Sequence, residues 1–264
     1  MLFFFGTTIP QKKESPAAAA ETSHTPKAID VNQLLRHARE RLTPDQERRV
    51  ASMEAMVTRG DVKNQQLQSY LQLAAFWRDT IRLFEPYAYY TSEAAKLDNS
   101  EKSLTFAAHL FLTNLKTESD PAMQNWLATN ARELFERSLE VNPKNDSSKI
   151  GLGACYIFGN ISSNPMEGIA PIREIVQRDP ENTFGQFILG LGGVKSGQYD
   201  KAIERFLIVI KKEPDNLEAA LNLAEAYDQK GDKGEAVKWY QYVKTKIPNP
   251  DVQKELDARI KALK

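Results

Sequence analysis

The sequence predicts an all-α protein in which pairs of antiparallel helices stack into a solenoid. After Ile29 the apolar residues recur at spacings of three and four along successive segments, which is the periodicity of amphipathic helices. No segment of useful length alternates between apolar and polar residues as a strand does. Pro180, Pro214 and Pro248 lie 34 residues apart, and a period of this length is typical of helical repeat proteins.

The composition is that of an ordinary globular chain. It has 264 residues, of which 41% are hydrophobic and 27% charged, so a sizeable core can form and a wholly disordered chain is excluded. The 35 basic residues balance 35 acidic ones, which argues against a nucleic-acid binder because no net charge attracts phosphate backbones. Cys155 is the single cysteine, so the chain can form neither an intramolecular disulfide nor a cysteine-based structural zinc site.

Residues 1–28 are predicted to be a disordered tail or linker. Leu2 to Phe5 form an apolar tetrad, and the polar stretch from Lys12 to Lys27 has no aromatic or β-branched apolar residue to bury. Two interpretations of the tetrad stay open: a frayed terminus without function, or the remnant of a membrane anchor whose beginning is missing. The sequence as it stands indicates a cytoplasmic protein, whereas a truncated start would indicate a membrane-anchored one.

Residues 29–100 are predicted to form a divergent helical region. Periodicity alone places its helices at 31–42, 43–60, 63–84 and 86–97. We interpret the aromatic residues of this region as interhelical core. They are Tyr70, Phe76, Trp77, Phe84, Tyr87, Tyr89 and Tyr90. Whether these helices are divergent repeats or a separate cap that covers a binding groove stays open.

Residues 101–264 are predicted to form the solenoid. Its parts are four repeats at about 101–145, 146–182, 183–216 and 217–250, and a capping helix at 251–264. Each repeat ends in a similar short motif around a proline, such as Arg178-Asp179-Pro180-Glu181-Asn182. Proline ends a helix because it lacks an N–H donor and disfavours the α conformation in the residue before it. We expect the repeats after Pro143 to form one cooperative stack.

The segment from Thr183 to Pro250 resembles two tandem tetratricopeptide repeats. The matching residues of the second repeat are Leu223, Ala224, Tyr227, Gly231, Asp232, Ala236, Tyr240 and Pro248. Those of the first are Leu189, Gly190, Gly197, Gln198, Ala202, Phe206 and Pro214. The repeat at 146–182 is three residues longer, and the repeat at 101–145 matches more loosely. The resemblance implies a stack of helical hairpins in which small residues stand where helices approach closely.

Two segments need separate comment. The helix after Thr183 has Gln186 and Gly193 where the family usually has a large aromatic residue and a tyrosine, and each interior glycine costs about 1 kcal/mol relative to alanine. We expect this helix to depend on its neighbours or on a bound partner. The capping helix has an apolar stripe of Val252, Leu256, Ile260 and Leu263. We expect its other face to be exposed, with Lys254, Glu255, Asp257, Arg259 and Lys261.

The sequence proposes no enzyme, no cofactor and no metal site. His24, His37 and His109 are scattered singly, without the spacing of a metal pair. Cys155 lies on an apolar helix and is interpreted as a packed thiol. The glycines from Gly190 to Gly193 lie within a repeat helix, whereas a nucleotide-binding glycine loop follows a strand.

The resemblance implies protein binding, because the first helices of these repeats line a concave groove that receives a peptide or a helix. The expected groove residues are Phe184, Phe187, Leu191 and Val194 on one helix face, and Leu221, Asn222, Glu225 and Asp228 in the next repeat. This groove would be apolar in the middle and acidic toward its C-terminal end. An intramolecular helix from the N-terminal half that covers the apolar stripe is the competing interpretation.

The predicted function is a non-catalytic adaptor or scaffold for a protein or peptide of unknown identity. The alternative is a helical accessory subunit of a larger membrane-associated or envelope assembly. An acidic C-terminal tail is a disfavoured ligand, because Asn222 alone occupies a position of the family's carboxylate clamp. Phe187 and Leu191 in the preceding repeat cannot pair with a carboxylate. Phe187, Leu191 and Phe184 are the expected apolar anchors, and Glu225 and Asp228 are expected to select a basic flank.

Overall fold

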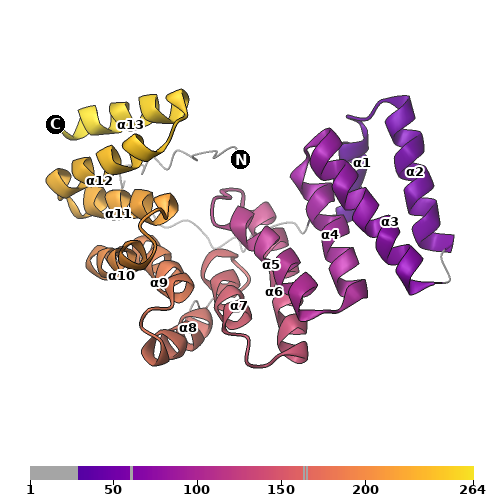
Figure 1. The fold of residues 1–264 in the computed structure, drawn as a ribbon, viewed down its shortest axis with the longest axis horizontal. Coiled ribbons are helices and arrows are strands. Elements are labelled where there is room, and N and C mark those ends of the chain that lie inside the picture. Colours follow the sequence, from indigo (N-terminus) through magenta and orange to yellow (C-terminus); the bar gives the residue numbers. More distant parts are fainter. Residues whose placement is uncertain (1–28, 60–61, 163, 165) are drawn as a thin grey trace, which may run out of the picture. The chain divides into compact units, whose positions relative to one another are not determined.

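The structure is a computed structural model that describes residues 29–59, 62–162, 164 and 166–264. These residues form thirteen α-helices and one π-helical turn, and no strand occurs among them (Figure 1). The all-α prediction is confirmed. The predicted tail at 1–28 lies outside the described residues, so its two interpretations stay predictions.

The chain divides into two compact units between residues 164 and 165. The helices of the first unit are α1 (Val31–Arg39), α2 (Pro44–Arg59), α3 (Lys63–Phe76), the π-helical turn η1 (Trp77–Ile81), α4 (Phe84–Asp98), α5 (Glu101–Leu115), α6 (Pro121–Val141) and α7 (Asp146–Phe158). Those of the second unit are α8 (Met166–Arg178), α9 (Thr183–Lys195), α10 (Tyr199–Lys212), α11 (Leu217–Lys230), α12 (Lys233–Lys246) and α13 (Pro250–Leu263).

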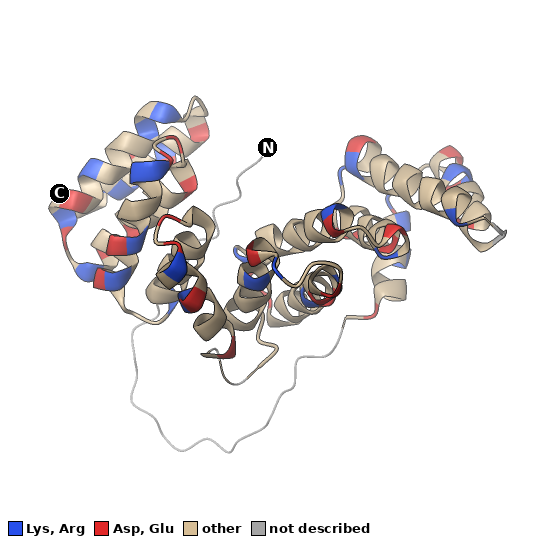
Figure 2. Cartoon of the chain, turned by 60° about the horizontal axis from the view of Figure 1, so that its bottom comes forward, with Lys and Arg blue, Asp and Glu red and all other residues tan. Residues whose placement is uncertain are grey.

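From α2 onward within the first unit, and throughout the second, consecutive helices pack against each other, whereas α1 packs against α4. In the second unit α9 packs against α10, α10 against α11, and α11 against α12, while the first helices α9 and α11 also touch (Figure 1). In the first unit α5, α6 and α7 pack in the same way, and α5 also touches α7. Lys, Arg, Asp and Glu residues are interspersed along the helices of each unit (Figure 2), in line with the balanced charge.

The short segments around the repeated prolines end one helix and also contain the N-cap of the next helix. Asn145, Asn182, Asn216 and Asn249 are the N-caps of α7, α9, α11 and α13. The Asn182 side chain accepts a hydrogen bond from Gly185 N at 2.9 Å, and the Asn216 side chain accepts one from Ala219 N at 2.9 Å. Such caps satisfy N–H groups that have no partner within the helix. The repeated asparagine therefore sets where each first helix begins.

The boundary between the units bears on the repeats after Pro143, whose folding as one cooperative stack stays a prediction. It falls inside the predicted repeat at 146–182, whose first helix α7 packs against α6 and α5, while its second helix α8 packs against α9.

The helix that the sequence predicts at 63–84 is interrupted in the structure. Helix α3 ends at Phe76, and the turn η1 leads to Arg82, which has a φ of 60° in the left-handed region. The Leu83 N–H donates to the Trp77 carbonyl at 3.1 Å, and this bond closes the widened turn. The spacing of apolar residues does not indicate where a residue adopts a positive φ. The spacing alone therefore predicts a helix that continues to residue 84.

The aromatic residues of the N-terminal helices form interhelical core, as predicted. Phe76, Trp77 and Tyr90 are buried in one cluster, and Tyr70, Tyr87 and Tyr89 pack around it. The Phe76 and Trp77 rings meet edge to face with centroids 5.7 Å apart, and the Phe84 ring meets the Phe111 ring of α5 at 6.4 Å. Edge-to-face pairs of this kind add to the stabilisation from burial alone.

Glycines stand where neighbouring helices approach most closely. A Cβ atom on Gly190 of α9 would lie 2.6 Å from Phe206 Cε1 of α10, and one on Gly151 of α7 would lie 2.2 Å from Phe135 Cζ of α6. A Cβ on Gly193 would lie 3.2 Å from the Ala202 Cβ. The glycines of α9, which weaken it as an isolated helix, therefore permit its close packing against α10.

Candidate functional site

The first helices α9 and α11 position the predicted groove residues. Phe184, Leu191, Val194, Leu221, Asn222, Glu225 and Asp228 are half-buried, whereas Phe187 is buried. The two helices touch, and both begin at an asparagine N-cap, so the two sets of residues belong to neighbouring helices that start in the same way. The structure thus brings onto neighbouring helices seven residues that retain some exposure.

Phe187 is not an exposed aromatic residue, and that expectation is wrong. Its side chain is 6% exposed, and its ring lies 5.9 Å from the Phe206 ring of α10. Helix α9 is buried on more than one side because it packs against α8 and α10 and also touches α11. Residues 185–190 are accordingly all buried. Phe187 belongs to the core that supports the surface formed by Leu191 and Val194.

The acidic end of the predicted groove is partly neutralised by the capping helix. Arg259 of α13 lies 3.0 Å from Glu225 Oε1 and 3.2 Å from Glu255 Oε1, and its guanidinium lies 5.9 Å from the centre of the Tyr240 ring. Arg259 and Glu255 are half-buried, so these two members of the face of α13 that was expected to be exposed are only partly so. The expected stripe is confirmed, because Leu256 and Ile260 are buried in the core cluster of the last helices and Val252 and Leu263 pack against it.

Two polar residues of the site differ in how they are engaged. The Asn222 side chain donates to the Glu218 carbonyl of its own helix at 2.8 Å. The Asp228 carboxylate has no hydrogen bond or ion pair with the described residues. Asp228 is therefore the acidic group of this surface that remains free for a cation.

Glu225→Gln is expected to flatten the dependence of stability on pH. Burial raises the pKa of the Glu225 carboxyl above its ordinary value of 4.5, in spite of the Arg259 guanidinium beside it. The folded state therefore binds the proton more tightly than the unfolded state, so stability falls as pH rises from 4.5 through the raised pKa. Glutamine does not titrate and still accepts a hydrogen bond from Arg259. Urea unfolding measured from about pH 4 to pH 8 checks this result.

The matched control for this prediction is Glu174→Gln. Glu174 is an exposed residue of α8 whose carboxylate has no partner among the described residues. Its replacement should leave the pH profile of wild type unchanged. An equally steep decline in the Glu225→Gln protein would show that another group causes it.

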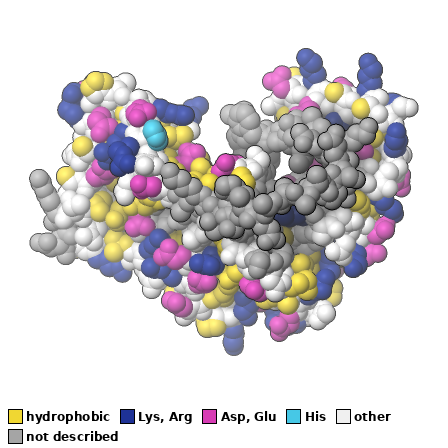
Figure 3. Space-filling model, turned by 180° about the vertical axis from the view of Figure 1, so that it is seen from behind, with side chains coloured by type: hydrophobic (Ala, Val, Ile, Leu, Met, Phe, Trp, Pro, Cys, Tyr) yellow, Lys and Arg dark blue, Asp and Glu magenta, His cyan; other side chains and the backbone are white. Residues whose placement is uncertain are grey.

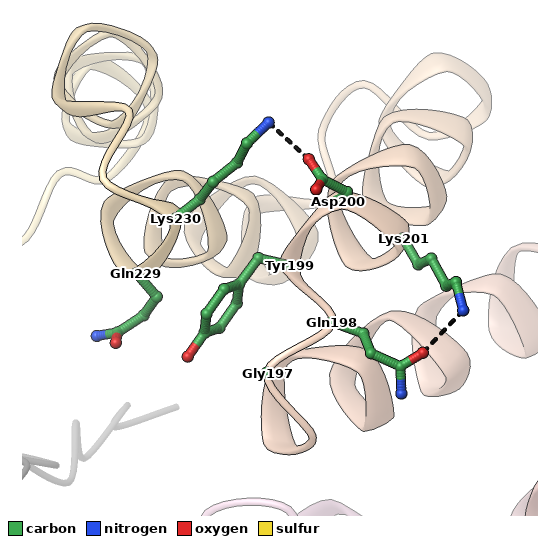
Figure 4. Close-up of a pocket in the computed structure, with 7 residues that line it drawn as sticks. All are labelled: Gly197, Gln198, Tyr199, Asp200, Lys201, Gln229 and Lys230. Atoms are coloured by element: carbon green, nitrogen blue, oxygen red, sulfur yellow. Dashed lines mark hydrogen bonds and ion pairs between the residues drawn. The ribbon is translucent and has the colours of Figure 1, made fainter.

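A pocket of about 360 Å³ lies at the turn ends of the same repeats (Figure 4). It is lined by Gly197, Gln198, Tyr199, Asp200, Lys201, Gln229 and Lys230. Lys230 Nζ lies 2.6 Å from Asp200 Oδ1, and Lys201 Nζ donates to Gln198 Oε1 at 2.9 Å. Lys230 and Asp200 therefore neutralise each other, and the ammonium group of Lys201 has a hydrogen-bond acceptor. None of the predicted groove residues lines this pocket.

The reactive residues are engaged in packing. Burial raises the pKa of the Cys155 thiol, whose Sγ donates to the Gly151 carbonyl at 3.2 Å, so the nucleophilic thiolate is disfavoured. Burial lowers the pKa of His109, whose Nε2 lies 2.9 Å from Ser147 Oγ. His37 is exposed beside Glu40, and His24 lies outside the described residues.

The described residues offer neither a metal-ligand cluster nor a membrane-spanning helix. They contain no group of three or more His, Cys, Asp or Glu side chains that could hold a metal ion. Of the helices that the structure describes, none is both long and apolar enough to span a membrane.

Residues 189–250 match the family model of the tetratricopeptide repeat. Among solved structures, the chain is similar to TTC0263, a thermophilic TPR protein of Thermus thermophilus, with a TM-score of 0.55 and 18% identity over 75% of this chain and 98% of that chain. YrrB, titled a TPR protein with an unusual peptide-binding site, has a TM-score of 0.43 and 15% identity over 78% and 96% of the two chains.

A third similar structure is the MamA protein, with a TM-score of 0.43 and 19% identity over 69% of this chain and 92% of that chain. Comparison of the sequence with curated proteins gives no match. The likeness to the Thermus protein shows a shared fold.

Proposed function

We propose that this chain is a protein–protein interaction module that binds a partner segment across α9 and α11. Residues 189–250 match the tetratricopeptide-repeat model, and the fold is shared with a TPR protein of Thermus thermophilus. The observation that carries this proposal is the half-buried surface that the two first helices share. Its apolar side chains are Phe184, Leu191, Val194 and Leu221, and its polar ones are Asn222, Glu225 and Asp228. The surface needs no catalytic group to perform this function.

The partner segment is amphipathic and carries a basic residue at one end. Leu191 and Val194 offer apolar contact area, whose burial drives association. Asp228 has a free carboxylate, whereas Glu225 is already paired with Arg259, so a partner's cation is directed to Asp228. Charge at such a position sets orientation and specificity more than affinity.

An acidic C-terminal tail remains a disfavoured partner. The Asn222 amide is engaged with its own helix, Phe187 is buried, and Leu191 offers no hydrogen-bond donor. The free carboxylate of Asp228 nearby would repel the carboxylate of such a tail. Figure 3 shows apolar side chains lying between charged ones on one face of the molecule.

Peptide display on the full chain provides the test of this proposal. We expect selection from a random peptide library to enrich apolar residues at helical spacing with Lys or Arg at one end. Calorimetry should then show that Leu191→Ala weakens binding of a selected peptide by about tenfold or more. Asp228→Asn should weaken binding less and reduce its dependence on salt concentration.

Leu207→Ala is the matched control. Leu207 is an exposed leucine, at 39%, on the second helix α10, and it is not part of the proposed surface. Its loss should leave peptide affinity unchanged. Equal affinities of the Leu191→Ala, Leu207→Ala and wild-type proteins, with all three equally stable, would contradict the proposed surface.

A further inference from the structure

A second pocket, of about 440 Å³, opens within the first unit between α1, α2, α3 and α4. It is lined by Asp30, Asn32, Leu35, Arg36, Arg39, Glu54, Val57, Thr58, Tyr70, Leu73, Tyr89 and Tyr90. Its volume lies within the range of roughly 300–1,000 Å³ that is typical of small-ligand sites. It shares no residue with the surface proposed for the protein partner.

Part of the lining is apolar and continuous with the core. Leu73 is fully buried, and Leu35 and Val57 pack against the same buried cluster. The rings of Tyr70 and Tyr89 add aromatic walls and also pack against this cluster. This part of the pocket suits an apolar group, because its burial there removes apolar area from water.

Most charged groups of the pocket already have partners within the protein. The Arg39 guanidinium pairs with the Glu54 carboxylate, which also accepts a hydrogen bond from the Tyr90 hydroxyl. The Asp30 carboxylate accepts from Asn32 N at 2.8 Å as the N-cap of α1. Arg39, Glu54 and Tyr90 therefore form one internal network, in which the charges of Arg39 and Glu54 offset each other, while Asp30 serves as a helix cap.

The unpartnered donors of the lining include one cation and two phenols. The guanidinium of Arg36 and the hydroxyls of Tyr70 and Tyr89 have no hydrogen bond or ion pair with the described residues. Burial raises the pKa of Tyr89 to about 12, so its hydroxyl keeps its proton at neutral pH and can donate it in a hydrogen bond. One unpaired cation and two phenol donors favour an acceptor that carries negative charge.

We propose that this pocket binds a carboxylate that is attached to an apolar body. The carboxylate pairs with Arg36 and accepts from the two tyrosine hydroxyls, while the apolar body lies against Leu35 and Val57. Two sources share this chemistry: a small monocarboxylic acid, and the C-terminal carboxylate of a chain that ends in an apolar residue. The site is independent of the partner surface on α9 and α11.

The test is titration of the full chain with 3-phenylpropionate, its amide and 3-phenylpropylamine, followed by calorimetry and NMR. We expect the carboxylate to bind with saturation and the amide and amine to bind at least about tenfold more weakly. Arg36→Gln should weaken carboxylate binding by about tenfold. Arg36 is exposed and unpaired, so this change should leave the thermal melt unaltered.

Arg41→Gln is the control, because Arg41 is an exposed arginine near α1 that does not line the pocket. It should bind 3-phenylpropionate as wild type does. The proposal is overturned if no saturable binding occurs up to about 5 mM, if the amide or amine binds as tightly as the carboxylate, or if Arg36→Gln binds unchanged.

A peptide arm distinguishes the two sources. A tetrapeptide that ends in phenylalanine is compared with the same peptide carrying a C-terminal amide. Tighter binding of the free-acid peptide than of 3-phenylpropionate, lost in the amide, supports a chain terminus as the ligand. Binding of 3-phenylpropionate with none of the peptide supports a small acid. Equal binding of the acid and amide peptides counts against carboxylate recognition.

Discussion

Phe187→Ala is expected to lower the free energy of unfolding by about 3–5 kcal/mol. The Phe187 ring is buried between α9 and α10 and packs against the ring of Phe206. Its truncation removes apolar burial and leaves a cavity that the helices cannot fully close. Urea unfolding followed by circular dichroism measures the loss, and the melting temperature should fall by several degrees.

Leu207→Ala serves as the comparison for this substitution. Leu207 lies on α10, next to Phe206 in sequence, but its side chain is exposed. Its replacement should change stability by no more than about 0.5 kcal/mol. A Phe187→Ala protein as stable as the Leu207→Ala protein would mean that Phe187 lies at the surface and serves as an anchor after all.

Gly151→Ala is expected to destabilise the first unit by about 1–3 kcal/mol. The added methyl group would lie 2.2 Å from the Phe135 Cζ atom, and Phe135 is fully buried. The helix propensity gained, about 1 kcal/mol, is smaller than the cost of the clash. Gly190→Ala should behave in the same way in the second unit, since Phe206 lies 2.6 Å from the position of its Cβ.

Gly234→Ala is the control with the opposite sign. Gly234 lies in the first turn of α12, where a Cβ would meet only Asp232 Oδ1 at 3.8 Å. Alanine there should raise stability, by up to about 1 kcal/mol, because it reduces the freedom of the unfolded chain. Stabilisation by Gly151→Ala as well would refute the close approach of α6 and α7.

Much of the fold was predictable because its signals are local in the chain. Apolar spacing reports helices, and the proline motif reports where one helix ends. The period places Asn182 and Asn216 one repeat apart, and both are N-caps of first helices. Small residues such as Gly190 and Ala202 indicated where two helices approach closely, and the contacts of Gly190 bear this out.

The candidate site was predictable only to the level of its helices. The residue spacing correctly places Phe187 and Leu191 on the same face of the helix. It does not indicate which part of that face the neighbouring helix covers. Phe206 covers Phe187, whereas Leu191, one turn further along, retains some exposure. The pocket of the first unit gave no sequence signal, because its lining comes from four helices and no motif joins Arg36 to Tyr70 or Tyr89.

The sequence by itself determined the class of fold, because helical periodicity depends on residues within about one turn of each other. It also determined the repeat period, because the prolines that recur every 34 residues can be read directly along the chain. Only the tertiary structure decided that Phe187 is core, that Arg259 neutralises Glu225, and that the units divide between residues 164 and 165. Arg259 and Glu225 are 34 residues apart, and their pairing depends on how α13 lies against α11. Such contacts between helices are set by the packing of whole elements, which no local pattern encodes.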